Sequence, residues 1–149
     1  MRQKHIPALA IVVFLLVTAF LSPQAQAQCK SFVKNCIVQL NPYLHDGNYQ
    51  ATIMGEGEEA ELYKTIFAGQ RYRLMVCIEN NLPNVEFVVT DIRRTILFDS
   101  RKNDNAKMWD FKSDVSQQIK ITIRIPKRQG KTEKELEYGC VGILFGLLE

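Results

Sequence analysis

The amino-acid sequence predicts a mainly β protein, an antiparallel β-sandwich of about eight strands with one N-terminal α-helix packed on it. Three observations lead to this prediction. From residue 49 onward, short runs of alternating apolar and polar residues are separated by turn-forming Gly, Pro, Asn and Asp residues. No long helical pattern lies between these runs, so parallel βαβ units are not expected. A single helical pattern precedes them at residues 29–40, and the number of strands favours a jelly-roll-like arrangement.

The first 27 residues have the features of a secretory signal peptide. Arg2 and Lys4 precede an apolar run at residues 8–21, and Ala25-Gln26-Ala27 fits a small-residue cleavage site. The apolar run is shorter than the ~20 residues of a membrane-spanning helix. Gln28, in front of Cys29, is not the small residue that a lipidation signal needs. We therefore expect residues 1–27 to be removed and residues 28–149 to form a single domain, located in the periplasm or outside the cell.

Residues 29–40 have the periodicity of an amphipathic helix. Apolar residues recur at helical spacing and form one stripe, made of Cys29, Phe32, Val33, Cys36, Ile37 and Leu40. Asn41-Pro42 ends the pattern, because the residue before a proline is pushed out of the helical region.

The remaining chain is predicted to form short strands, of which residues 118–125 alternate most clearly, with isoleucine at every second position. A tight turn at Ala68-Gly69-Gln70 joins the second and third strands. In order, the predicted strands are Tyr49–Met54, Ala60–Phe67, Arg71–Glu79, Val85–Asp91, Thr95–Asp99, Met108–Lys112, Gln118–Ile125 and Gly139–Leu147.

All four cysteines lie behind the predicted cleavage site, and an even number in an exported chain indicates disulfides. Residues seven apart on a helix are ~10.5 Å apart along its axis, too far for a bond between Cys29 and Cys36. If the helix forms, each of its cysteines should bond to Cys77 or Cys140, which fall on the outward face of their strands. The alternative is a local Cys29–Cys36 loop with a Cys77–Cys140 bond.

The sequence offers no catalytic constellation, so we do not expect an enzyme or a cofactor. His45 is the only histidine behind the leader, and it lies in a turn-like HDGN segment. The acidic residues Glu56, Glu58 and Glu59 lie in a glycine-containing loop that we interpret as a solvated turn. A calcium site is the alternative interpretation, because clustered oxygen ligands on a loop suit that ion.

Aromatic residues could build a sugar-stacking platform, with Trp109 joined by Tyr63, Tyr72 and Tyr138. A single tryptophan in an alternating strand beside Phe111 is more typical of a core residue, which is the interpretation that we favour. The basic loop at residues 127–131 is interpreted as a solvated hairpin tip. Without the leader the formal net charge falls from +3 to +1, so the sequence does not have the basic character typical of a nucleic-acid-binding protein.

Several segments together resemble a group of small exported proteins of Gram-negative bacteria, and that resemblance transfers no catalytic residue. They are LNPYLHDGNY, GEEAELYKTIFAGQRYRLMVC, FVVTDIRRTILFD, MWDFKSDVSQQIKITIRIP and GCVGILFG. More loosely, the order of strands is similar to pre-peptidase C-terminal domains and to the Golgi-dynamics (GOLD) sandwich. That resemblance rests on 89–91, 97–99 and the aromatic strand at 109–111, and it implies a binding or accessory module.

From these observations we expect a non-catalytic binding or interaction domain of the periplasm or cell envelope. Its partner would be an envelope protein or a glycan, and no transmembrane segment is expected after cleavage. The alternative function is a calcium- or carbohydrate-binding accessory domain of an envelope enzyme system.

Overall fold

The computed structural model describes residues 24–148, so most of the predicted signal peptide lies outside the described residues. The chain begins with helix α2 (Gln24–Cys36) and the 3-10 helix η1 (Ile37–Leu40). The strands are β1 (Leu44–Gly55), β2 (Glu59–Ile66), β3 (Arg71–Ile78), β4 (Glu86–Asp91), β5 (Ile96–Asp99), β6 (Met108–Lys112), β7 (Gln117–Arg124) and β8 (Tyr138–Leu148). Two short 3-10 helices, η2 (Ser100–Lys102) and η3 (Glu133–Glu135), lie in the connections.

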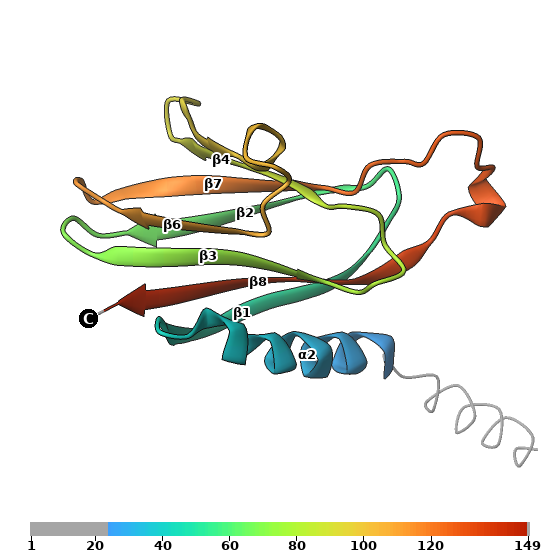
Figure 1. Cartoon of the computed structure of the whole chain (residues 1–149), viewed down its shortest axis with the longest axis horizontal. Helices are drawn as coiled ribbons and strands as arrows, with labels where there is room; N and C mark the ends of the chain where they lie inside the picture. The colour runs from blue at the N-terminus through green and yellow to red at the C-terminus, as the bar shows by residue number, and fades with distance from the viewer. Residues whose placement is uncertain (1–23, 149) are drawn as a thin grey trace, which may run out of the picture.

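The eight strands form two four-stranded sheets with the strand orders β1-β8-β3-β6 and β2-β7-β4-β5. Every pairing between them is antiparallel. These two orders are those of a jelly roll, and the chain crosses between the sheets at every connection except that between β4 and β5. The two sheets and the helix make three layers (Figure 1). The predicted mainly β sandwich with one N-terminal helix is therefore confirmed.

The tight turn predicted between the second and third strands is present, with Gly69 at φ +82°. It does not close a hairpin, because β2 pairs with β7 while β3 pairs with β8 and β6. The turn instead carries the chain from one sheet to the other. Local turn chemistry predicts where a chain reverses, but partner choice depends on which strands bury their apolar faces together.

The main core lies between the sheets and is built from the inward faces of their strands. Strand β3 supplies Tyr72, Leu74 and Val76, all at most 3% exposed. The other large contributions come from β7 and β8, through Ile119, Ile121, Ile123, Val141, Ile143 and Phe145. Burying each such side chain stabilises the fold by ~1.5–3 kcal/mol before the entropy cost. The period-two pattern thus places these residues on the face that the sequence predicted.

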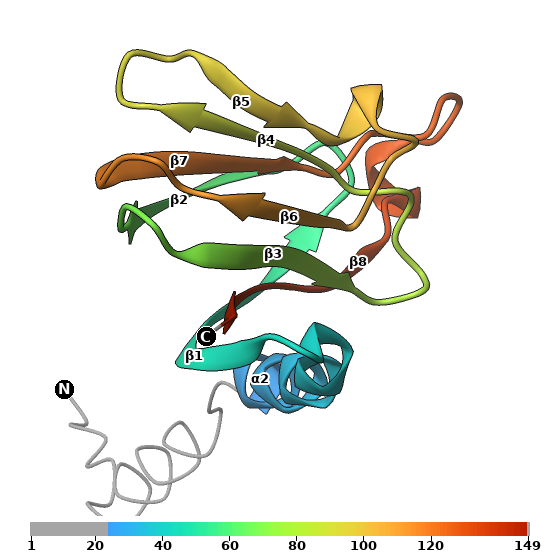
Figure 2. The same ribbon diagram turned by 60° about the vertical axis from the view of Figure 1, so that its left-hand side comes forward.

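A second cluster lies on the opposite face of the first sheet, under α2 and η1. Val33, Cys36 and Leu40 of the helical segment contact the outward-facing Met75, Cys77 and Leu144. Figure 2 shows the helix lying across the outer side of β1 and β8. The helix comes so close to β8 that a Cβ at Gly142 would lie 2.3 Å from Val33 Cγ2. A glycine in this strand therefore allows the contact.

The predicted helix differs from the observed one at its two ends. In the structure the last turn of the helical segment, η1, is 3-10 rather than α. The segment ends at Asn41, as expected. Arg73 stabilises the C-terminal end of the helical segment, because its guanidinium donates hydrogen bonds to the carbonyls of Leu40 and Asn41 and to the Asp110 carboxylate. The helix begins at Gln24, so cleavage after Ala27 would remove its first turn. Within residues 24–148, no helix has the length and apolarity to cross a membrane.

Candidate functional site

One end of the sandwich carries three strand-connecting turns, at residues 67–70, 92–95 and 113–116, which we call the turn face. Two of these turns are tied together by backbone hydrogen bonds. The Gly69 N–H donates to the Ser113 carbonyl at 2.7 Å, and the Ser113 N–H donates to the Gln70 carbonyl at 3.0 Å. The Ala68 N–H also donates to Ser116 Oγ. The turns at 67–70 and 113–116 therefore form one connected surface rather than two independent loops.

The turn at residues 92–95 is stabilised by Asp91, the last residue of β4. Its carboxylate accepts hydrogen bonds from the N–H groups of Arg93 and Thr95, both at 2.8 Å. The hydrogen bond from the Thr95 backbone is the largest cause that lowers the pKa of Asp91. Arg94 adopts a left-handed conformation with φ +67°. The aspartate thus fixes the turn in a geometry that holds Ile92 and Arg93 out into solvent.

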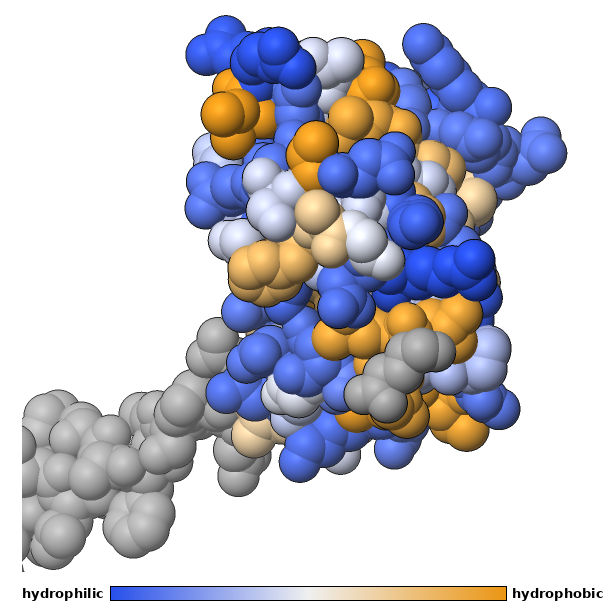
Figure 3. Space-filling model, turned by 90° about the vertical axis from the view of Figure 1, so that its left-hand side faces the viewer, coloured by the Kyte–Doolittle hydropathy of each residue, from blue (hydrophilic) through white to orange (hydrophobic). Residues whose placement is uncertain are grey.

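Four aliphatic side chains at this end are exposed, and we call them the turn patch: Ile92, Ile96, Leu97 and Val115. Ile92 is 75% exposed, an unusual position for a large aliphatic side chain at the tip of a turn. The basic residues Arg93, Arg94 and Lys112 lie beside the patch and are also exposed. Figure 3 shows this end of the molecule, where hydrophobic side chains gather in several patches with hydrophilic ones between them. Several exposed apolar side chains at one end of a molecule are candidates for an interaction site.

The aromatic residues close the side of the sandwich between β5 and β6. Phe98 stacks on Trp109 at 5.1 Å between ring centroids, and Trp109 stacks on Phe111 at 3.9 Å. Leu97 and Val115 line a hollow of about 250 Å³ in front of Trp109. Tyr72 is buried beside Phe111, whereas Tyr63 and Tyr138 are exposed on other parts of the surface. The four residues considered as a sugar platform are therefore not brought together.

The opposite side, between β1 and β2, contains a cavity of about 430 Å³. Its floor is aromatic and its rim is polar. Residues from four strands and one turn line it: Asp46, Asn48, Lys64, Thr65, Phe67, Gln70, Tyr72, Phe145 and Leu147. Lys64 forms an ion pair with Asp46 across the opening.

The three glutamates of the acidic loop have separate partners. The Glu56 side chain is fully buried, and it accepts hydrogen bonds from the side chains of Arg128 and Lys131. The Arg128 hydrogen bond is the largest cause that lowers the pKa of Glu56 to about 2. Glu58 accepts from the Gly55 N–H, and Glu59 pairs with Arg124. The Glu56 carboxylate thus joins the β1–β2 loop to the basic loop before β8.

The described part of the chain, residues 24–148, contains no group of three or more His, Cys, Asp or Glu residues placed to hold a metal ion. His45 is mostly buried, with Nε2 4.0 Å from Asp46 Oδ1 and without a hydrogen-bond partner in the structure. Neither a serine nor a cysteine is hydrogen-bonded to it among the described residues, so the arrangement gives no activated nucleophile.

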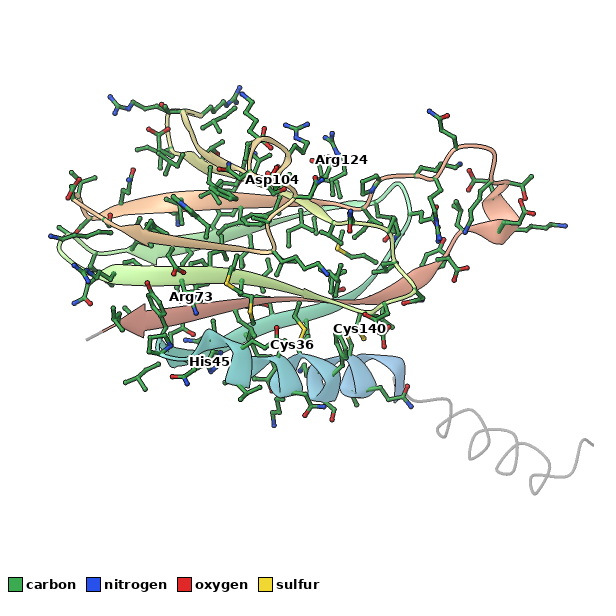
Figure 4. The ribbon with its side chains drawn as sticks, viewed as in Figure 1. Cys36, His45, Arg73, Asp104, Arg124 and Cys140 are labelled. Carbon is green, nitrogen blue, oxygen red and sulfur yellow. A yellow bond between two sulfur atoms is a disulfide. The ribbon has the colours of Figure 1, made fainter. Side chains whose placement is uncertain are left out.

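The cysteines link helix α2 to the first sheet. Cys36 forms a disulfide with Cys77, which excludes the alternative Cys29–Cys36 bond. Cys29 and Cys140 are buried thiols. Burial, followed by the hydrogen bond with Cys29, raises the pKa of Cys140 to about 12. Figure 4 shows Cys36 and Cys140 at the boundary between α2 and the sheet.

No protein-family model matches the chain, and no curated protein matches it significantly. A solved structure with a similar fold is PliG of Aeromonas hydrophila, a periplasmic inhibitor of g-type lysozyme. It has a TM-score of 0.50 and 11% sequence identity, over 72% of this chain and 89% of that one. PliG of Salmonella Typhimurium has a TM-score of 0.39 and 8% identity, over 66% of this chain and 86% of that one. The first likeness shows a shared fold, and the second is too low to support an argument. The looser resemblance to pre-peptidase C-terminal and GOLD domains stays a prediction.

Sequence reasoning missed both the turn patch and the residues around the large cavity. Ile92 had a local signal, since it stands in a turn beside two arginines where alternation predicts no buried position. The cavity had none, because its polar rim combines Asn48, Lys64 and Gln70 from separate elements that only the sheet topology brings together.

Proposed function

We propose that this protein is a non-catalytic binding domain of the cell envelope that holds a protein partner through the turn patch. The observation that carries the proposal is the exposure of four aliphatic side chains at one end of the sandwich, two in hydrogen-bonded turns (Ile92 and Val115) and two at the start of β5 (Ile96 and Leu97). Fixed turns lower the entropy cost of binding, and apolar side chains at the centre of an interface supply most of its affinity.

The surroundings of the turn patch favour a partner with an acidic contact surface. Arg93 and Arg94 flank Ile92, and Lys112 lies near Val115, whereas Asp114 is the exposed acidic residue in the same turn as Val115. Basic groups at the rim of an apolar patch steer an acidic partner and suppress others.

The predicted signal peptide and the shared fold support a periplasmic location. PliG of Aeromonas hydrophila, which shares the fold, is a periplasmic inhibitor of g-type lysozyme. A g-type lysozyme is therefore the first partner to test, followed by proteins of the bacterium's own envelope.

The experiment compares two variants that introduce the same charge at equally exposed positions. Ile92→Asp changes the turn patch, and Val38→Asp changes η1 on the far side of the first sheet; the two side chains are 75% and 76% exposed. Binding of purified g-type lysozyme and of envelope proteins is measured with immobilised protein. We expect Ile92→Asp to weaken binding of the captured partner about tenfold or more, and Val38→Asp to leave it unchanged.

Equal affinity of the two variants for the partner would contradict the proposal. The proposal would also be contradicted if the double variant Ile92→Asp/Val115→Asp bound the partner with the same affinity as the wild-type protein. Far-UV circular dichroism of each variant confirms that the sheets are intact.

A further inference from the structure

The two open sides of the sandwich are built differently. Each side lies between the edge strands of the two sheets, β5 with β6 on one and β1 with β2 on the other. The Phe98–Trp109 stack packs across the first side and leaves only the hollow of about 250 Å³ in front of Trp109. The second holds the 430 Å³ cavity, a volume inside the roughly 300–1,000 Å³ range of small-molecule sites.

The floor of this cavity is aromatic and held in place by the core. Tyr72 and Phe145 are each 3% exposed, while Phe67 at its edge is 59% exposed. The Phe67 N–H donates to the Tyr72 hydroxyl at 2.9 Å, which fixes the turn against the ring. The exposed ring of Phe67 can contact the C–H face of a ring-shaped ligand without requiring the ligand to be wholly apolar.

The rim of the cavity is polar and largely uncharged. Lys64 lies over the Phe145 ring, 5.0 Å from its centroid, and pairs with Asp46, so the two charges compensate one another. Asn48, Thr65 and Gln70 add amide and hydroxyl groups. The Asp46 carboxylate is also held in position, because it accepts a hydrogen bond from the Asn48 N–H at 2.8 Å. A polar, neutral and preorganised rim suits a ligand with many hydroxyl groups.

Lys64 takes an inward position in β2, where Ala60, Leu62 and Ile66 are the other inward residues. An inward charge on an edge strand also discourages pairing with another strand. The shift of register in β1 between His45 and Tyr49 acts the same way, since it breaks the regular edge at the cavity. A peptide strand added to this edge is therefore a poor occupant of the cavity. Protection of the edge strand does not by itself explain why aromatic and amide side chains line the cavity.

We propose that this cavity binds a pyranose sugar of an envelope glycan, with the ring against the exposed Phe67 side chain and its hydroxyls on Asp46, Asn48 and Gln70. The site shares no residue with the turn patch, although its residues Phe67 and Gln70 lie in the turn face. One surface would then hold a protein and the other a glycan, which would place the protein partner next to the glycan.

The test is titration of the ¹⁵N-labelled protein with two neutral probes, a tetramer of N-acetylglucosamine and a tetramer of glucose. We expect saturable shifts of β1, β2 and the 67–70 turn with at least one of them. Phe67→Ala and Gln70→Ala should each weaken that binding about tenfold. Tyr63→Ala is the matched control, because Tyr63 is 56% exposed on the outward face of β2 and outside the cavity.

The proposal is overturned if neither tetramer gives saturable shifts at ~10 mM, or if Tyr63→Ala lowers affinity as much as Phe67→Ala. Phe67 and Gln70 are exposed, so their replacement leaves the core intact. Ile92→Asp should leave sugar binding unchanged, so failure of the glycan site and failure of the protein-binding proposal are told apart.

Discussion

Glu56 of the acidic loop is buried and ion-paired with Arg128, although the composition of this loop suggests a solvated turn. Its carboxylate is bound by Arg128 and Lys131 and accepts N–H groups from Arg128 and Glu137. With its oxygens used in this way, it has little capacity left for a calcium ion. A buried carboxylate requires such partners, because an unpaired charge would be costly to bury.

This arrangement predicts a specific pH dependence. The pKa of Glu56 is lowered from its ordinary value of 4.5 to about 2, so its contribution to stability is complete above 4.5 and is lost as pH falls towards about 2. Glu56→Gln should lower the urea midpoint at neutral pH and flatten its decline in this range. Glu133→Gln, at a side chain 86% exposed, should keep the wild-type profile. Equal pH profiles for Glu56→Gln and wild type would show that the ion pair contributes nothing.

Among the elements, helix α2 depends most on contacts with residues far away in the sequence. Its stripe covers an otherwise exposed apolar face of the first sheet, and Gly142 lets it come close. The Cys36–Cys77 bond ties its C-terminal end to β3. A disulfide of this kind stabilises a small domain by ~2–4 kcal/mol, chiefly by restricting the unfolded chain.

At the other end of the helix we expect a second disulfide, between Cys29 and Cys140. The two thiols are buried and hydrogen-bonded to each other, and Cys29 also donates to the Thr52 carbonyl. The raised pKa of Cys140 makes the reactive thiolate scarce once the helix is docked. The bond should therefore form by exchange with a disulfide oxidant of the periplasm before docking is complete.

Mass mapping of unreduced, exported protein tests this expectation. A Cys29 peptide joined to a Cys140 peptide is the expected product, alongside the Cys36–Cys77 pair. Alkylation of both Cys29 and Cys140 without prior reduction would show instead that they remain thiols, and a reduced sample serves as the reference.

For the whole molecule, the Phe98–Trp109 contact is the point where the two sheets meet on the side between β5 and β6. Trp109 comes from β6 in the first sheet and Phe98 from β5 in the second. The pair continues to Phe111 and Phe87, so the stack runs from one sheet into the other. The interpretation of Trp109 as a packing residue agrees with this position.

Trp109→Ala should therefore lower the free energy of unfolding by about 2–4 kcal/mol, since it removes a partly buried aromatic from a stack. Urea unfolding followed by far-UV circular dichroism measures the loss, because the variant has no tryptophan to report it. Met108→Ala is the control, as Met108 is its neighbour in β6 and 39% exposed. A loss for Trp109→Ala no greater than that for Met108→Ala would mean that the stack does not hold the sheets together.

The sequence by itself determined the elements and their buried faces. Period-two alternation predicted the strands, the helical stripe predicted the segment around Cys36, and helix geometry argued against a Cys29–Cys36 bond, which the Cys36–Cys77 disulfide then excluded. These features depend on residues close together in the chain, whose spacing is set by backbone geometry. Only the tertiary structure decided which strands pair, which cysteine meets Cys77, and which side chains share a surface. The turn patch and the open cavity join residues from separate turns and edge strands, and no local pattern records such distances.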